Sequence, residues 1–323
     1  MAKIDSYLLK SFWPIFFTIF SVLFLITSII IIISIANITS NIHITSYELF
    51  KMYLLSLPKV IFITISVSFF ISSVSLFAKH SETQELIAIF AAGIAPQKLL
   101  KPFLLLAWFF TIINIFILFI SIPYAKVAFI NFKIQKQQEA KFNFQTSQVS
   151  QKFGEWNIFA TSKNQKNYIN LVLYNNKTRQ LILADKANLH NLNAYLKFTL
   201  QNGNVYSFKD DIVINFKKMT INQKIPKKNY SIFNFAEYFD KFKELFIFYL
   251  PFALIPVILI FYVPYIAVFH PRIDKNRSLI YALVLLSAYL IMTKISSSII
   301  VTLAISVTFM AAGYYLYKRM MKF

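Results

Sequence analysis

The chain has 323 residues, of which 57% are hydrophobic, 18% aromatic and only 14% charged. Soluble domains are about 45–50% apolar and about a quarter charged, so this composition predicts a membrane protein. The absence of cysteine excludes disulfides, iron–sulfur clusters and thiolate metal sites. A net charge of +20 could indicate nucleic-acid binding, but that needs an exposed basic face on a soluble module. We therefore expect membrane lipids, and no nucleic acid, among its partners.

Six stretches without Asp, Glu, Lys or Arg are candidate membrane spans, because a bilayer core is crossed by roughly 20 apolar residues in a helix. Eleven basic residues fall at the chain ends or in loops on the same side, whereas only Lys51, Lys59 and Lys294 fall in the short loops opposite. The positive-inside rule therefore predicts a multi-pass protein with both termini in the cytoplasm. The six stretches are 11–36, 60–78, 102–125, 245–271, 278–293 and 295–317.

The long segment 126–243, between the third and fourth spans, alternates apolar and polar residues as β-strands do. Asn202-Gly203 is a strong hairpin signal and predicts a turn, and an Asn-rich turn separates two further strands within 168–185. The sequence predicts one antiparallel β domain inserted between 1–125 and 244–323, which hold three transmembrane helices each. One apolar face of its strands comprises Leu196, Phe198, Leu200, Ile212, Ile214 and Phe216.

Motifs for catalysis and nucleotide binding are absent from the sequence. It contains no G-x-x-x-x-G-K-[ST] phosphate loop, no H-E-x-x-H zinc motif and no G-x-S-x-G nucleophile turn, and its four histidines are scattered. We therefore predict no catalytic residue, no metal and no cofactor in this chain, which is not expected to be an enzyme.

A short helix is predicted at 81–93, between the second and third spans. Ser81 and Gln84 fit a capping box, two glutamates complement the helix dipole in the first turn, and Gly93 supplies the stop. About 11 residues make about 16 Å, which is too short to cross a bilayer. A helix on a lipid surface usually carries Lys or Arg on its polar face. This helix is acidic instead, so docking on a protein is favoured over lipid binding.

The same stretch, QELIAIFAAGIAPQKLLKP, resembles the cytoplasmic loop of the lipopolysaccharide-export permease family LptF/LptG. The preceding LPKVIFITISVSFFISSVSLFAKHSETQEL is similar to the family's second helix. GEWNIFA, LILADKA and FTLQNGNVY resemble strands of the family's β domain, and HPRIDKNRS resembles the loop before its fifth helix. The resemblance runs nearly from end to end of the chain.

The resemblance implies an α-helical integral membrane protein of the bacterial inner membrane, with six transmembrane helices and an inserted periplasmic antiparallel β-jellyroll. Such a chain is one permease subunit of an ABC transporter that extracts lipopolysaccharide and passes it to a periplasmic bridge toward the outer membrane. The implied partners are an LptB-like ATPase dimer, which uses the ATP, a second LptF/LptG-type permease, and LptC-like and LptA-like periplasmic proteins. The helix at 81–93 would be the ATPase-coupling helix, with contacts from Glu85, Leu86, Ile89, Phe90 and Gly93.

The sequence allows two roles for several residues. Lys59 and Lys294 contact substrate phosphates or extend to the lipid headgroups, and the prolines of the fourth span form a gating hinge or fixed kinks. Phe198, Ile214 and Phe216 are the candidate contacts for acyl chains in the β domain. Two other functions compete with export: a subunit that only transmits ATPase motion, and an intramembrane enzyme, for which the spans show no polar constellation.

Overall fold

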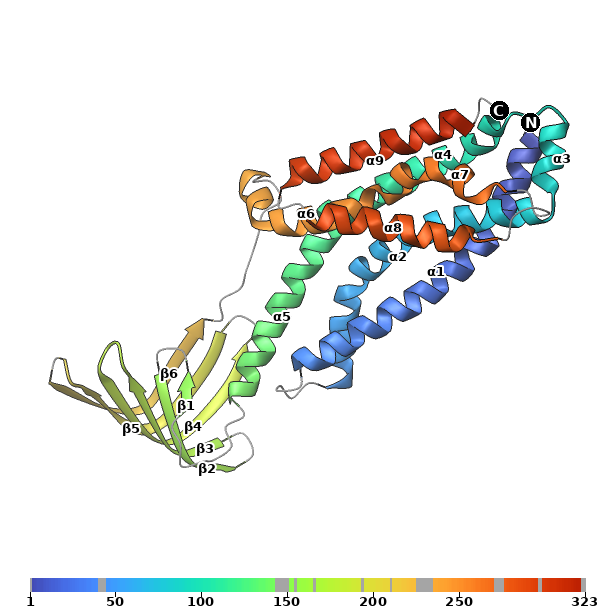
Figure 1. The fold of residues 1–323 in the computed structure, drawn as a ribbon. Coiled ribbons are helices and arrows are strands. Elements are labelled where there is room, and N and C mark those ends of the chain that lie inside the picture. The colour runs from blue at the N-terminus through green and yellow to red at the C-terminus, as the bar shows by residue number, and fades with distance from the viewer. Residues whose placement is uncertain are drawn as a thin grey trace. The chain divides into compact units, whose positions relative to one another are not determined.

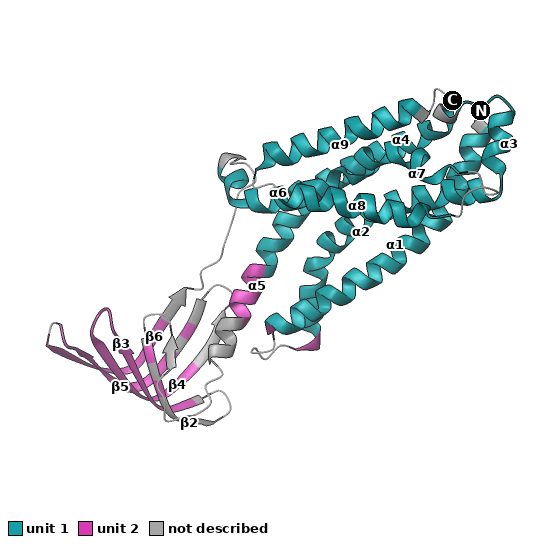
Figure 2. Ribbon diagram, viewed as in Figure 1, with its two compact units in different colours: residues 1–38, 47–129, 230–323 teal, residues 39–46, 130–229 magenta. Residues whose placement is uncertain are grey.

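The computed structural model describes residues 2–39, 45–142, 151–153, 156–164, 167–192, 195–209, 211–224, 235–269, 276–295 and 298–320. The chain divides into two compact units (Figure 2). Unit 1 comprises Met1–Ile38, Tyr47–Phe129 and Tyr230–Phe323, and unit 2 comprises Thr39–Ser46 and Ile130–Asn229.

Unit 1 is a bundle of long apolar helices (Figure 1). Before the inserted β segment it has α1 (Ala2–Thr39), α2 (Ser46–Glu82), the short α3 (Glu85–Ala91) and α4 (Pro96–Phe116). Helix α4 continues through a π-helical turn (Ile117–Ser121) into α5 (Ile122–Phe142), whose residues from Ile130 onward belong to unit 2. The later elements of unit 1 are α6 (Phe235–Leu259), a 3₁₀ turn (Ile260–Tyr262), α7 (Val263–Ala267), α8 (Ser278–Lys294) and α9 (Ile299–Met320).

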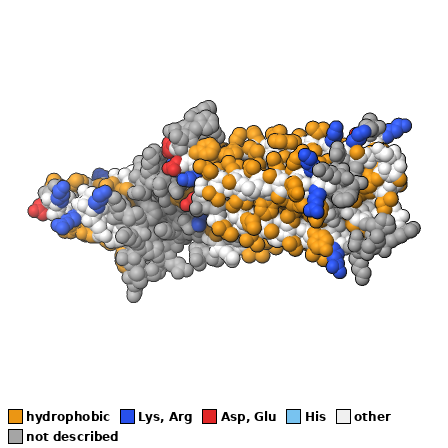
Figure 3. Space-filling view, turned by 45° about the horizontal axis from the view of Figure 1, so that its top comes forward, with side chains coloured by type: hydrophobic (Ala, Val, Ile, Leu, Met, Phe, Trp, Pro, Cys, Tyr) orange, Lys and Arg blue, Asp and Glu red, His pale blue; other side chains and the backbone are white. Residues whose placement is uncertain are grey.

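Five of these helical segments are long and apolar enough to cross a membrane, and α8 is a sixth apolar helix of 17 residues. The predicted α-helical membrane protein is therefore confirmed. The third and fourth segments extend beyond the predicted spans, because α5 continues to Phe142 and α6 already begins at Phe235. On the face drawn in Figure 3, hydrophobic side chains cover the middle of the bundle, and Lys and Arg gather toward the end where the chain's termini lie.

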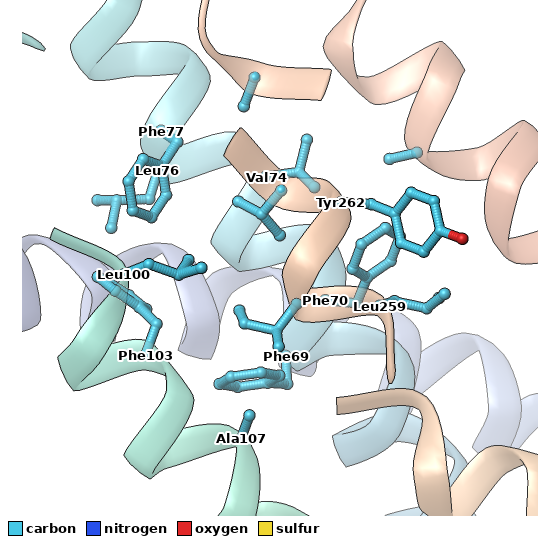
Figure 4. Close-up of a cluster of buried hydrophobic side chains, with 14 of the residues drawn as sticks. Phe69, Phe70, Val74, Leu76, Phe77, Leu100, Phe103, Ala107, Leu259 and Tyr262 are labelled. Carbon is cyan, nitrogen blue, oxygen red and sulfur yellow. The ribbon is translucent and has the colours of Figure 1, made fainter. Parts of the chain in front are cut away.

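Aromatic and aliphatic side chains together make the core of the bundle (Figure 4). Phe69 of α2 contacts Phe12 of α1 and Phe110 of α4, with ring centroids 5.8 and 5.2 Å apart, and Phe77 contacts Phe103 at 5.2 Å. Since lipid is as apolar as these side chains, close packing rather than hydrophobic transfer holds such helices together. The packing therefore fixes α2 between α1 and α4.

The fourth span, predicted as one run over 245–271, is broken. Pro251 and Pro256 lie inside α6, whereas Pro264 lies in the first turn of α7, directly after the 3₁₀ turn. Proline cannot donate a backbone hydrogen bond but is tolerated in the first turn of a helix. The break at residues 260–262 is thus compatible with Pro264 at the start of a new helix.

Unit 2 contains six antiparallel strands in sequence order: β1 (Gln151–Phe153), β2 (Trp156–Asn164), β3 (Asn167–Asn175), β4 (Gln180–Leu192), β5 (Tyr195–Ser207) and β6 (Ile212–Lys224). The inserted antiparallel domain is confirmed. Its described strands form one meandering sheet, so the crossovers of a two-sheet jellyroll are not among them (Figure 1). The predicted Asn-rich turn is confirmed, since the Asn175 side chain accepts hydrogen bonds from the backbone N–H groups of Lys177 and Thr178.

The hairpin predicted at Asn202-Gly203 is wrong, because β5 passes straight through these residues. Asn202 has a positive φ of 47°, and Asn170 of β3 has one of 51°. A left-handed residue inside a strand interrupts the regular alternation of side chains. Leu200 and Val205, which ordinary alternation would place on opposite faces, are accordingly both buried in the same core. Neighbouring strands pair with β5 on both sides of the interruption and prevent it from turning.

Candidate functional site

The short helix α3 (Glu85–Ala91) has seven residues and begins later than predicted. Ser81 and Glu82 belong to the last turn of α2, and Gln84, with a φ of 60°, separates the two helices. The predicted capping box is therefore wrong. The Ser81 hydroxyl is instead bonded to the backbone N–H and carbonyl of Phe269, at 3.0 and 2.9 Å, and this contact ties the end of α2 to the end of α7.

The predicted stop at Gly93 is confirmed. Gly93 has a φ of 79°, its N–H donates to the Phe90 carbonyl, and the N–H of Ile94 donates to the Ile89 carbonyl. These two bonds make a Schellman motif, which satisfies the free carbonyls at a helix end and favours glycine. Helix α4 then starts at Pro96, so the chain reverses within a few residues.

We predict that Gly93→Ala loosens α3 without affecting the bundle. A Cβ at this position would meet no atom within 4 Å, so the only cost is the left-handed backbone, about 1 kcal/mol or slightly more. Amide hydrogen exchange in α3 should then become about fivefold faster or more, while the unfolding midpoint of the protein in detergent stays unchanged. Gly93→Asn is the control, because asparagine tolerates this conformation better. Equal exchange in the two variants would refute the role of the left-handed cap.

Glu85, the first residue of α3, is held by two other helices. Its Oε2 atom accepts a hydrogen bond from the Tyr7 hydroxyl of α1 at 3.0 Å and lies 2.6 Å from Nδ1 of His80 in α2. Burial acts to raise the pKa of Glu85, but the hydrogen bonds from His80 and then Tyr7 outweigh it and lower the pKa below the ordinary value. The carboxylate is therefore ionised at neutral pH, and His80 Nδ1 carries the donated proton.

The side chains of α3 divide into an inner and an outer face. Leu86 is completely buried in the bundle core, and Ile89 and Phe90 are half-buried against it. Leu86 was predicted as a coupling contact, but it has no exposed surface and serves to hold α3 in place. The exposed residues include Ile87, which is 38% exposed, and the neighbouring Ala88, Ala91 and Ala92.

A cavity of about 610 Å³ lies in unit 1 among α1, α2, α5 and α6. Its polar lining includes Lys59, Lys126 and Glu244, and the remainder is mostly apolar and aromatic. Tyr7 contacts α3 at the first turns of α1, whereas Ile31, Ile35 and Ile38 line the cavity at its last turns. At 1.5 Å per residue, the length of α1 places α3 and the cavity about 40 Å apart.

The two predicted substrate lysines lie against aromatic rings of the cavity. Lys59 Nζ is 5.7 Å from the centroid of the Tyr249 ring, and Lys294 Nζ is 4.5 Å from that of Phe248. Both rings line the cavity, as does Lys59, whereas Lys294 does not. Both lysines are exposed. A cation over an aromatic face is stabilised there and still presents its remaining N–H groups to an anion.

Lys126 lines the cavity but is not among the site residues predicted from the sequence. The charge of Lys126 ends the uncharged run 102–125, so the sequence alone places this residue at the start of the β domain. The helical signal was nevertheless available, since Ile122, Ala125 and Phe129 continue the three- and four-residue spacing of a helix face, and all of them line the cavity.

The predicted lipid contacts of the β domain are only partly described. Ile214 is 56% exposed and pairs with the buried Val205 of β5, and Phe216 packs half-buried against the same core. The side chain of Phe198 lies outside the described residues. No group of three or more His, Asp or Glu side chains in the described part of the chain is arranged to hold a metal ion.

A family model described as lipopolysaccharide export system permease LptF/LptG matches residues 6–317 of this chain. The chain belongs to the LptF/LptG family. No individual curated protein matches the sequence. The family match covers the apolar helices and the inserted sheet, and it identifies this LptF/LptG chain as a lipopolysaccharide export permease of the inner membrane.

Proposed function

We propose that this chain is one half of the permease of an ABC exporter, in which a separate ATPase drives the extraction of lipopolysaccharide. The cavity lined by Lys59 and Lys126 is the observation that carries the proposal. It combines cations with an apolar wall, as the phosphates and acyl chains of a glycolipid require. A subunit that only transmits motion needs no such cavity.

The end of the bundle that carries α3 is the proposed ATPase side. The first residues of α1, the last residues of α9 and α3 lie at this end (Figure 1), and we assign it to the cytoplasm from the asymmetry of the basic residues. The exposed Ile87, Ala88 and Ala91 offer a small apolar face that fits a groove on another protein. An LptB-like ATPase dimer is the proposed occupant, and Glu85, Ile89, Phe90 and Gly93 support this face from behind.

The cavity end is then the periplasmic side, where lipopolysaccharide enters from the outer leaflet. Lys59 and Lys126, which line the cavity, are the proposed contacts for its phosphates, and Lys294, which lies over the ring of the lining residue Phe248, is a further candidate. A second LptF/LptG-type permease would complete the entry site. The partly exposed apolar face of the sheet, which includes Ile214 and Phe216, is proposed to carry acyl chains toward LptC-like and LptA-like proteins.

Site-specific photo-crosslinking tests this function. A benzophenone amino acid at Tyr249, which lines the cavity, should capture lipopolysaccharide in vesicles that contain the assembled transporter, and the yield should change when ATP is added. The matched control is Phe109, an aromatic residue of α4 that is 56% exposed and does not line the cavity. A third probe at Ile214 should capture the lipid only in the presence of ATP.

Two outcomes would contradict the proposal. If Tyr249 and Phe109 capture lipopolysaccharide equally, the lipid is bulk membrane lipid and the cavity is not its path. If Tyr249 captures only protein, with and without ATP, a subunit that transmits motion without moving lipid becomes the better description.

A further inference from the structure

A second and larger cavity, of about 950 Å³, lies among α7, α8 and α9. It shares no lining residue with the cavity around Lys59. Its lining combines one cation, several tyrosines and an apolar wall, and the proposed transport path leaves it without a role. The residues that matter here are Arg277, Tyr265, Tyr281, Val284, Ala288 and Leu316.

The lining along α8 changes from charged to apolar. Arg277, Tyr281, Val284 and Ala288 are three or four residues apart, so they lie on one face of the helix. From Arg277 to Ala288 this face extends about 16 Å at 1.5 Å per residue, which is about the depth of one leaflet's hydrocarbon. We call this cavity the groove. Along α8 the groove is first cationic, then aromatic and then apolar. A phospholipid has the same order, with its phosphate followed by the glycerol region and then the acyl chains.

Arg277 is free to bind an anion. Its side chain is exposed, and no acid in the described part of the chain forms an ion pair with it. The nearby Glu82 carboxylate accepts a hydrogen bond from the Asn276 side chain at 2.8 Å, so the adjacent residue, and not Arg277, engages this acid. A guanidinium can bind a phosphate through two parallel N–H donors.

We propose that this groove binds an anionic phospholipid. The lipid belongs to the membrane leaflet at the end of the bundle where the chain's termini lie. The phosphate binds Arg277, the glycerol region lies between Tyr265 and Tyr281, and one acyl chain runs along Val284 and Ala288 against Leu316. Basic pockets between transmembrane helices bind anionic headgroups in this way. The lipid is a resident component that joins α7, α8 and α9, and it is not the exported cargo.

The inference depends on membership of an inner-membrane family and is independent of the proposed ATPase partner and of the export direction. Ser278 and Ala282 at the start of α8 are buried against the bundle, whereas Tyr281 and Val284 on the groove side are exposed. A lipid bound between α7 and α8 would cover this exposed side.

The test uses two photoactivatable lipids, a phosphatidylglycerol and a phosphatidylcholine that carry a diazirine in the acyl chain, in vesicles with the full-length protein. We expect phosphatidylglycerol to label peptides that contain Tyr281 or Leu316 several times more strongly than phosphatidylcholine. Arg277→Gln should lower this preference about fivefold, the effect of one basic residue at a membrane surface. Ala288→Trp, which fills the groove, should remove labelling by both lipids.

The matched control is Arg319→Gln, because Arg319 is a basic residue near the end of α9 that does not line the groove. Equal labelling by the two lipids, or an equal effect of the Arg277 and Arg319 substitutions, would overturn the proposal. Labelling that disappears when a second permease chain is present would show that protein covers the groove, and would overturn it as well. Because lipopolysaccharide capture at Tyr249 reports on transport, either hypothesis can fail without the other.

Discussion

Gly203→Ala is expected to destabilise the β sheet of unit 2 strongly while leaving the helical bundle intact. A Cβ at Gly203 would overlap the backbone carbonyl oxygen of Leu183 and lie 2.7 Å from Cζ of Phe216. The phenylalanine ring can rotate away, but the carbonyl belongs to β4, which is paired with β5 on both sides of this point. We expect a loss of about 3 kcal/mol or more and a fall of about 10 °C or more in the unfolding midpoint of the sheet.

The measurement is protease sensitivity of unit 2 against temperature, in the full-length protein in detergent. Gly93→Ala is the matched control, since the same methyl group enters empty space there. A double substitution, Gly203→Ala with Phe216→Ala, separates the two collisions. The double variant should remain destabilised, because it removes the collision with the Phe216 ring but keeps the collision with the Leu183 carbonyl oxygen. Full recovery of the unfolding midpoint would mean that the backbone contact with β4 is unimportant.

Glu85→Lys is expected to lower the proposed ATP-driven export tenfold or more, while the protein still inserts into the membrane. Helix α3 has only seven residues, and isolated helices shorter than about 12–15 residues are marginal in water. Its position therefore depends on the buried Leu86 and on the bonds from Glu85 to Tyr7 and His80. Lysine removes the acceptor and places a cation beside the donor group of His80.

A hydrogen bond to a charged group contributes about 1.5–3 kcal/mol, and the contribution is smaller here because the Glu85 side chain is 40% exposed. A loss of about 1.4 kcal/mol lowers the equilibrium constant between correctly placed and displaced α3 tenfold. A large loss of export therefore requires that the placement of this seven-residue helix is only marginally favoured. Because the folded-state pKa of Glu85 is lowered, its stabilising contribution is present above the ordinary glutamate pKa and is lost as the pH falls through the folded value.

Three measurements are needed: lipopolysaccharide release by the reconstituted transporter, its ATPase rate, and the amount of ATPase that copurifies with the permease. Glu85→Gln keeps an oxygen acceptor for Tyr7 and should lose much less activity than Glu85→Lys. Glu82→Ala is the matched control and should have a mild effect, since Glu82 bonds to Asn276 and not to Tyr7 or His80. Normal export by Glu85→Lys would show that α3 does not need this anchor.

The apolar helices could be located from the sequence because the insertion of a segment into lipid depends on the hydrophobicity of its own consecutive side chains. The stop at Gly93 and the turn at Asn175 were predictable for a similar reason. Both involve bonds within a few residues, which the local sequence encodes. The family resemblance added the order of the elements, and the match to residues 6–317 agrees with it.

The start of α3, the course of β5 and the composition of the cavity were decided by contacts between residues far apart in the chain. Ser81 bonds to Phe269, 188 positions away, instead of capping a helix. Asn202-Gly203 stays within a strand because β4 and β6 pair on either side of it. Lys126 joins the cavity because α5 continues past the uncharged run and packs beside α1, α2 and α6. A local pattern fixes what a segment prefers, but bonds and packing with distant segments outweigh that preference wherever both compete for the same backbone or side chain.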